Sequence, residues 1–170
     1  DRAAMQAIIH ALLNLSKRRI GALIVLQRYV ALGDIIETGT RLESDISAQL
    51  LESIFMPGTP LHDGATIIKD GQIVAAGCFL PLSDTQDLPK ELGTRHRAAL
   101  GMSEVSDSLA FVVSEETGTI SLAYEGTLKR NLDGAAIRRA LLMGSGLGQK
   151  QDSRLGNILN RFKKNGRTEE

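Results

Sequence analysis

The sequence contains a single cysteine, no tryptophan and no excess of charge of either sign. One cysteine cannot form a disulfide within the chain, and Cys78 lies in an apolar run, so it reads as a small buried residue in a reduced, cytosolic setting. Lys plus Arg and Asp plus Glu number 20 each. No global charge therefore favours nucleic acid or a membrane surface, and any recognition of anions must be local. We expect no nucleic-acid partner.

Long apolar runs and several nucleotide-binding motifs are also missing. No stretch approaches the ~20 apolar residues of a membrane-spanning helix, and no signal-peptide pattern opens the chain. The pattern Gly-x-x-x-x-Gly-Lys-Ser/Thr does not occur, which excludes a P-loop enzyme, and there is no glycine-rich dinucleotide fingerprint. The first residue is Asp1 rather than Met, which is compatible with a fragment of a longer protein.

The length of 170 residues suits one domain with a real core, and 42% hydrophobic and 24% charged residues are typical of a globular protein. Apolar periodicity predicts one α/β domain over residues 1–143, with a mixed central sheet of at least five strands flanked by helices. Residues 144–170 have linker composition and are expected to form a flexible tail with a short helix over 155–164. The expected helices span 2–16, 44–55, 94–105 and 133–143, and the expected strands span 21–26, 65–69, 72–80, 109–114 and 119–123.

Two polar residues stand at the mouth of a predicted hairpin. Asp70-Gly71 is a strong hairpin signal between two apolar runs, and His62 and Asp63 come directly before the first of these strands. They offer nitrogen and oxygen ligands suited to Mg²⁺, Mn²⁺ or Co²⁺. The adjacent Gly64 would let a ligand approach the backbone. The simpler alternative is a loop in which Asp63 caps a turn.

A second polar cluster, Thr94-Arg95-His96-Arg97, opens a predicted helix for which Thr94 is a suitable N-cap. Free backbone N–H groups and the positive end of the helix dipole favour phosphate there. Residues two apart on a helix diverge, so we expect one arginine to hold a polyphosphate while the other reaches further along it or pins the loop. His96 would contact phosphate or hydrogen-bond within the turn. The alternative is a solvated helix end.

The tip of a second predicted hairpin adds Glu115 and Glu116, with Ser114 just before them. If the fold brings the two tips together, these glutamates would complete a metal site; otherwise they form a charged turn. Ser114 is either a phosphate contact or a cap. Carboxylates with a metal, facing an arginine-lined helix N-terminus, indicate phosphoryl or nucleotidyl transfer.

Asp63-Gly64-Ala65 and Arg95-His96-Arg97 resemble the two signature motifs of diadenylate cyclase domains. Further similar stretches are residues 18–25, 75–83 and 112–118, and the resemblance covers most of 3–143. It is strongest to the CdaA type, in which three membrane helices precede the cyclase domain. The resemblance implies that the parent protein lies on the cytoplasmic face of the cell membrane, anchored through a segment absent here, and that the present piece is soluble.

The family implies a reaction in which two ATP condense to cyclic di-AMP with release of two pyrophosphates, using Mn²⁺, Mg²⁺ or Co²⁺. Each protomer would hold one ATP, and a homodimer with two protomers face to face would be needed for catalysis. We weigh against this a non-catalytic sensor of ATP or cyclic di-AMP with the same fold. A third alternative is a metal-dependent phosphodiesterase or nucleotidyl transferase with another product.

The resemblance also assigns roles to single residues. Asp63 would bind the metal and help to activate the 3′-hydroxyl, with His62 and Glu116 as further metal contacts. Adenine would stack on Phe79, where many relatives carry tyrosine, and read backbone groups of Leu80; Phe79 as a core aromatic is the alternative. The catalytic set is then Asp63, Arg95, His96 and Arg97, and the nucleotide-binding set is Gly64, Ala65, Phe79, Leu80, Thr94, Arg95, Ser114 and Glu115.

Overall fold

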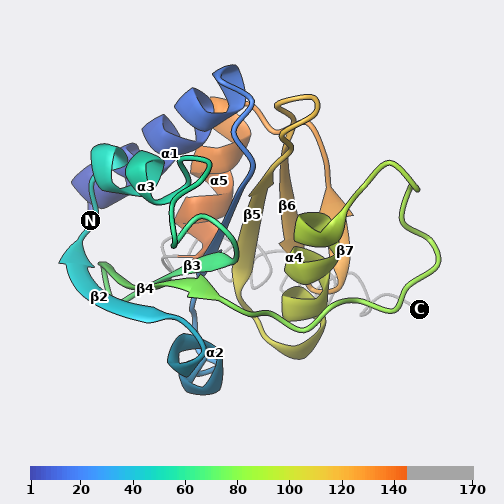
Figure 1. Cartoon of the computed structure of the whole chain (residues 1–170), viewed down its shortest axis with the longest axis horizontal. Coiled ribbons are helices and arrows are strands. Elements are labelled where there is room, and N and C mark those ends of the chain that lie inside the picture. The colour runs from blue at the N-terminus through green and yellow to red at the C-terminus, as the bar shows by residue number, and fades with distance from the viewer. Residues whose placement is uncertain (145–170) are drawn as a thin grey trace, which may run out of the picture.

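The structure is a computed structural model that describes residues 1–144; the predicted helix over 155–164, and all but the first residue of the predicted tail, lie outside the described residues. Seven strands form one mixed sheet, with five helices around it in the described part of the chain (Figure 1). The prediction of a single α/β domain with a mixed sheet of at least five strands is confirmed.

The central strand of the sheet is β1 (Ala22–Leu26), as its uninterrupted apolar run predicts. It pairs in parallel with β3 (Ala65–Lys69) on one side and antiparallel with β5 (Leu109–Val113) on the other. The full order is β2-β4-β3-β1-β5-β6-β7. The other strands are β2 (Thr40–Asp45), β4 (Gln72–Cys78), β6 (Ile120–Tyr124) and β7 (Thr127–Lys129).

The residues of β1 alternate between two apolar layers, one on each face of the sheet. Ile24 belongs to the layer shared with α1 (Arg2–Lys17), α3 (Ala48–Ile54) and α5 (Gly134–Gly144). Leu23 and Val25 belong to the layer covered by α4 (Thr94–Val105). Figure 1 shows α4 lying across the β5–β6 side of the sheet. Because α4 is the one long helix on this face among residues 1–144, it leaves part of the face available for a site.

Both edges of the sheet differ from the prediction. The segment 33–40, for which the sequence predicts neither a helix nor a strand, contains the short helix α2 (Gly33–Glu37), and the edge strand β2 follows it. The helix expected from residue 44 therefore begins only at Ala48, where the Ser47 hydroxyl accepts a hydrogen bond from Leu50 N–H at 3.1 Å. At the other edge, β7 was missed. Edge strands this short and exposed are defined by pairing with a neighbour, which leaves little apolar pattern in the sequence.

Most other elements agree to within one or two residues. Asp70 and Gly71 both have positive φ, as a type I′ hairpin requires, and the turn before Gly118 joins β5 to β6 as predicted. Strand β4 ends at Cys78 rather than residue 80, because Phe79 N–H donates to the Thr38 hydroxyl at 2.9 Å instead of continuing the ladder. Cys78 is buried, as expected.

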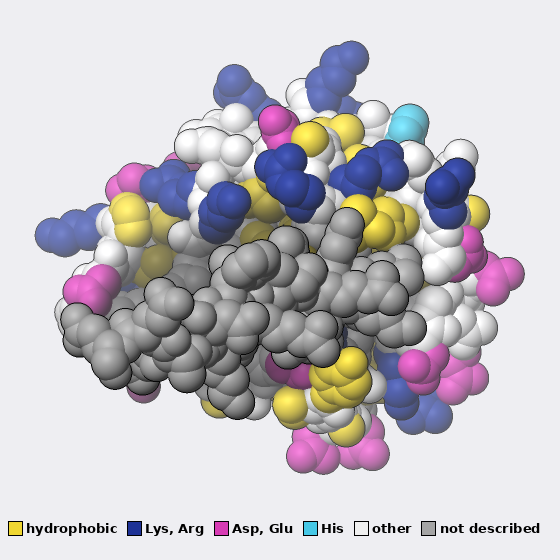
Figure 2. Space-filling model, turned by 180° about the vertical axis from the view of Figure 1, so that it is seen from behind, with side chains coloured by type: hydrophobic (Ala, Val, Ile, Leu, Met, Phe, Trp, Pro, Cys, Tyr) yellow, Lys and Arg dark blue, Asp and Glu magenta, His cyan; other side chains and the backbone are white. Residues whose placement is uncertain are grey.

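The surface charge is unevenly distributed although the net charge is zero. In Figure 2, most of the visible Lys and Arg side chains lie in the upper half of the face seen from behind. On the helices, Arg2, Lys17, Arg138 and Arg139 are exposed. No helix among residues 1–144 is long and apolar enough to cross a membrane.

Candidate active site

A cavity of about 530 Å³ opens beside the N-terminus of α4, at the ends of β4 and β5 and the beginnings of β1 and β3. This volume suits a small organic ligand. The cavity is lined by Leu23, Asp63, Gly64, Cys78, Phe79, Leu80, Leu82, Glu91, Gly93, Thr94, Arg95, His96, Ala98, Val113, Ser114, Glu115 and Glu116. The fold thus brings the Asp63 motif, the Arg95 motif and the Ser114 turn to one place, although they are far apart in sequence.

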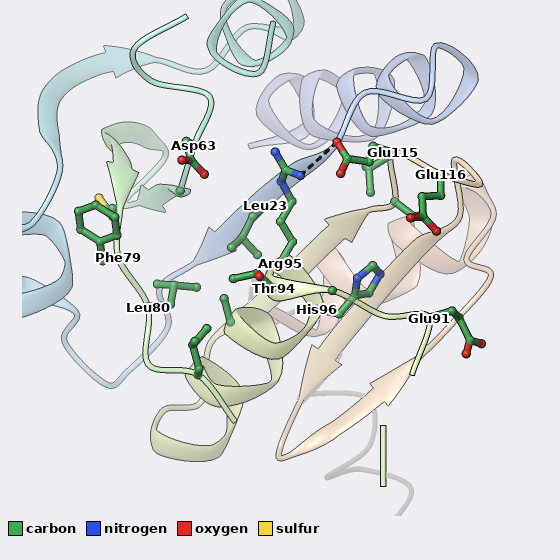
Figure 3. A pocket seen from close by; sticks show the side chains of 17 residues that line it. Leu23, Asp63, Phe79, Leu80, Glu91, Thr94, Arg95, His96, Glu115 and Glu116 are labelled. Atoms are coloured by element: carbon green, nitrogen blue, oxygen red, sulfur yellow. Dashed lines mark ion pairs between the residues drawn. The ribbon is translucent and has the colours of Figure 1, made fainter. Parts of the chain in front are cut away.

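The cavity has an apolar end and a polar end. In Figure 3, Phe79 and Leu80 lie on one side, Thr94 and Arg95 in the middle, and His96 and Glu91 on the other side. Phe79 is 69% exposed, so it is not a core aromatic. An open aromatic face at one end of a cavity is suited to stacking a planar heterocycle.

Asp63 lies at the rim, immediately before β3. Its side chain is exposed, and its carboxylate makes no hydrogen bond or ion pair within residues 1–144. The following Gly64 has φ +124°, and a Cβ there would lie 2.8 Å from the backbone carbon of Gly77. The tight approach of the two strands therefore fixes where Asp63 stands, and it leaves the carboxylate available for a ligand.

The N-terminus of α4 forms the floor of the polar end. Gly93, rather than the predicted Thr94, is the N-cap, and no side chain caps the helix. The first backbone N–H groups of a helix have no acceptor within it, and the helix dipole makes this end positive. With Thr94 and Arg95 in the cavity wall, the site is suited to an anion such as phosphate.

Arg95 extends from this helix end across the cavity. Its Nη1 lies 3.6 Å from Glu115 Oε2, and the dashed line in Figure 3 marks this ion pair. A Cβ on Gly21 would lie 2.5 Å from the same nitrogen. Gly21 therefore makes room for the arginine, a role that sequence reasoning missed; its only signal was a glycine at the start of an apolar strand. Other wall residues that were missed are Leu23, Cys78, Leu82, Glu91, Gly93, Ala98 and Val113.

Arg97 points elsewhere and holds the loop that follows β4. Its Nη1 donates to the Thr85 carbonyl at 3.0 Å and the Ser83 carbonyl at 3.4 Å, and Ser83 N–H donates to the Arg97 carbonyl at 3.0 Å. The prediction that the two arginines diverge is confirmed, and Arg97 is the one that pins the loop.

His96 is buried and also lines the cavity. Burial lowers the pKa of its imidazole, and the positive charges of Arg130 and Arg95 lower it further. The ring is therefore neutral at pH 7, with one nitrogen that donates and one that accepts.

The structure places two further predicted site residues outside the cavity wall. His62 is half-buried, and its Nδ1 contacts the Thr59 carbonyl. Ala65 is fully buried in β3. Among residues 1–144, no three or more His, Cys, Asp or Glu side chains gather as a metal-binding group. His62, Asp63 and Glu116 therefore do not form a ready three-ligand site, although Asp63 and Glu116 both line the cavity.

Several known proteins are similar to this chain in both sequence and fold. The family model described as DisA bacterial checkpoint controller nucleotide-binding (DAC) matches residues 9–128. The cyclic di-AMP synthase CdaA of Bacillus subtilis is 51% identical over 141 residues, which cover 83% of this chain and 52% of that protein. A diadenylate cyclase of Listeria monocytogenes is 57% identical over 128 residues, or 75% of this chain and 47% of that protein.

The chain belongs to the DAC family. The predicted likeness to the CdaA type is confirmed by the Bacillus subtilis relative. A crystal structure of DacA from Staphylococcus aureus superimposes with a TM-score of 0.83 at 47% identity, covering 84% of this chain and 95% of that chain. This DAC domain spans about half the length of the curated relatives it matches.

The side chains of the DAC domain are compatible with a divalent cation. Mg²⁺ and similar ions are commonly held by one or two carboxylates, with water and substrate phosphates completing the shell. The free Asp63 carboxylate supplies one such ligand, and Glu116 offers a second across the cavity. The fit requires a nucleotide to supply the remaining oxygens.

The division of labour between the two arginines can be tested by amide exchange. Arg97→Gln removes both bonds to the loop, so we expect amide hydrogen exchange of residues 83–87 to rise about tenfold or more. Arg95→Gln is the matched control, because Arg95 contacts Glu115 and not the loop. It should leave exchange in the loop unchanged. Equal exchange in both variants would contradict the assignment of Arg97 as the loop anchor.

Proposed function

We propose that this DAC domain is the catalytic domain of a diadenylate cyclase, which condenses two ATP into cyclic di-AMP with release of two pyrophosphates. The observation that carries the proposal is the composition of one cavity: an exposed aromatic ring at one end, a free carboxylate at the rim and an arginine at an open helix N-terminus. The names of the Bacillus and Listeria relatives support it.

The residues suggest how one ATP lies in the cavity. Adenine stacks on Phe79 and lies against Leu80, which places the phosphates toward the N-terminus of α4. Backbone N–H groups of that helix, the Thr94 hydroxyl and Arg95 then bind the phosphates. Arg95 would exchange the Glu115 carboxylate for a phosphate, and neutral His96 would donate or accept a hydrogen bond beside it.

Asp63 would hold a Mn²⁺, Mg²⁺ or Co²⁺ ion at the rim, with Glu116 and, after a change of the loop, His62 as further candidates. When bound, such an ion lowers the pKa of a coordinated hydroxyl and neutralises phosphate charge. The 3′-oxygen of one nucleotide forms a bond to the α-phosphorus of the other, the bond to the pyrophosphate oxygen breaks, and the hydroxyl proton leaves to solvent. Asp63 contributes by fixing the position of the reacting groups.

A single cavity of about 530 Å³ accommodates one nucleotide, whereas ring closure needs two. Asp63 and Phe79 are both exposed at the opening. We therefore infer that two protomers face each other in a symmetric dimer, so that each hydroxyl reaches the phosphate held by the partner.

We infer further that the parent protein is attached to the cytoplasmic face of the cell membrane. Support comes from a similar structure from Bacillus cereus, described as a hypothetical membrane spanning protein, at 51% identity with a TM-score of 0.73. The matched region covers 75% of this chain and 63% of the Bacillus cereus chain.

The proposal is tested by incubating the protein with ATP and Mn²⁺ over a range of protein concentrations and identifying the products by mass spectrometry. We expect cyclic di-AMP, formed at a rate per protomer that rises with concentration until the dimer is saturated. Chelation of the metal with EDTA should stop the reaction. If the protein binds ATP but forms no product at any concentration or with any metal, the proposed function is wrong and the protein is a nucleotide sensor. A product other than cyclic di-AMP would identify a different transferase.

A further inference from the structure

One residue of the cavity wall, Glu91, forms an ion pair that the proposed function does not use. Glu91 lies in the segment before α4 and lines the cavity. Arg130 comes directly after β7, and its Nη1 lies 3.5 Å from Glu91 Oε1. The pair joins two segments that are distant in sequence, at the end of the cavity opposite Phe79 (Figure 3, where Glu91 is drawn).

Arg130 lies beside the cavity, because its ion-pair partner Glu91 is part of the cavity wall. The positive charges of Arg130 and Arg95 also both lower the pKa of His96. His96 lines the cavity between Arg95 and Glu91 in Figure 3. A nucleotide with its base on Phe79 and its first phosphates at Arg95 would therefore extend its last phosphates toward Glu91 and Arg130.

We propose that Arg130 exchanges Glu91 for the terminal phosphates of ATP, and that this exchange makes the site prefer the triphosphate to the cyclic dinucleotide. The preference follows because cyclic di-AMP has no β- or γ-phosphate to offer Arg130. Glu91 acts in the opposite direction: it holds Arg130 when no triphosphate is bound, and its own charge repels phosphate. This inference rests on the proposed function.

The exchange is physically favourable because the existing pair is weak. Its two side chains are 36% (Arg130) and 63% (Glu91) exposed, and ion pairs in water contribute little to stability. A terminal phosphate carries more charge than a carboxylate and accepts paired hydrogen bonds from a guanidinium. Arg95 is arranged in the same way, with Glu115 at 3.6 Å. Both arginines near the cavity are thus paired with a carboxylate of its wall.

The test compares ligands with and without terminal phosphates, by isothermal titration calorimetry in Mg²⁺. The ligands are 3′-deoxy-ATP, which keeps the triphosphate but lacks the attacking hydroxyl, cyclic di-AMP, and inorganic pyrophosphate. We expect Arg130→Gln to weaken 3′-deoxy-ATP about tenfold and cyclic di-AMP less than about twofold, as for the loss of one charged hydrogen bond. Glu91→Gln should strengthen 3′-deoxy-ATP and leave cyclic di-AMP unchanged.

Lys129→Gln is the matched control, because it removes the same charge from the neighbouring exposed position. It should change neither affinity appreciably. Equal weakening of both nucleotides by Arg130→Gln, no weakening at all, or the same loss in Lys129→Gln would overturn the inference.

Pyrophosphate separates this inference from the proposed function. If the unaltered protein binds no 3′-deoxy-ATP, the proposed function fails. Loss of pyrophosphate binding in Arg130→Gln would even then support Arg130 as a phosphate ligand. The inference about Arg130 is overturned if Arg130→Gln binds pyrophosphate as well as the unaltered protein does. It is also overturned if the unaltered protein binds no pyrophosphate. Should Arg130→Gln fail to fold, Glu91→Gln decides: an unchanged affinity for 3′-deoxy-ATP contradicts the exchange.

Discussion

Replacing Asp63 with Asn is expected to abolish formation of cyclic di-AMP and to leave the fold intact. The substitution keeps the size of the side chain and removes its charge, so a divalent ion would lose the carboxylate that Asp63 offers at the rim. We expect the rate to fall by about 10²- to 10⁴-fold, the usual effect of removing a group that acts in the transition state. Because the Asp63 side chain is exposed and unpartnered within residues 1–144, the free energy of unfolding should change by less than about 0.5 kcal/mol.

The control for this variant lies at the other end of the same strand. Asp70→Asn makes the identical chemical change at the tip of the β3–β4 hairpin, where the residue is exposed and has φ +49°. Asn tolerates this conformation, so both stability and activity should remain. Product formation by mass spectrometry and unfolding in urea measure the two properties. An Asp63→Asn variant with full activity would remove Asp63 from the mechanism.

Replacing Gly64 with Ala is expected to be the most destabilising single-methyl change at the site. A side chain at φ +124° is strained, and the added Cβ would lie 2.8 Å from the Gly77 carbon and 2.9 Å from the Cys78 oxygen. Both are backbone atoms of the paired strand, which cannot turn aside as a side chain can. We expect a loss of about 3 kcal/mol or more in the free energy of unfolding, together with loss of activity because Asp63 is displaced.

Gly71→Ala separates the two causes. Gly71 also has positive φ, at +73°, but a Cβ there meets no atom within 4 Å. Only the backbone strain remains, so the expected loss is about 1 to 2 kcal/mol, without an effect on activity. Urea unfolding of both variants gives the comparison. If the two variants lose equal stability, the contact with β4 is not what requires glycine at position 64.

The role of Gly64 shows where sequence reasoning was incomplete. The sequence suggested that this glycine admits a ligand to the backbone, and Gly64 does line the cavity. The nearest atoms to a Cβ, however, belong to β4 and not to the cavity. A glycine in a motif signals a close approach, but the sequence does not say what approaches.

The central strands, the first hairpin and the site motifs could be predicted from local sequence patterns. The apolar run of β1 predicted a strand buried on both faces, and Asp70-Gly71 predicted the hairpin, because these signals are local and strong. The sequence also identified the two polar clusters around Asp63 and Arg95 as members of one site.

Tertiary structure alone decided the sheet edges and the orientation of each site residue. The strands β2 and β7 exist through hydrogen bonds to a neighbouring strand, and their residues carry almost no apolar pattern. Likewise, tertiary packing determines that the Arg97 side chain binds the loop and that the Arg95 side chain lies against Gly21. The ion pair between Glu91 and Arg130 joins two residues that are 39 positions apart in the sequence. Contacts of this kind depend on where distant parts of the chain meet, and no local pattern encodes them.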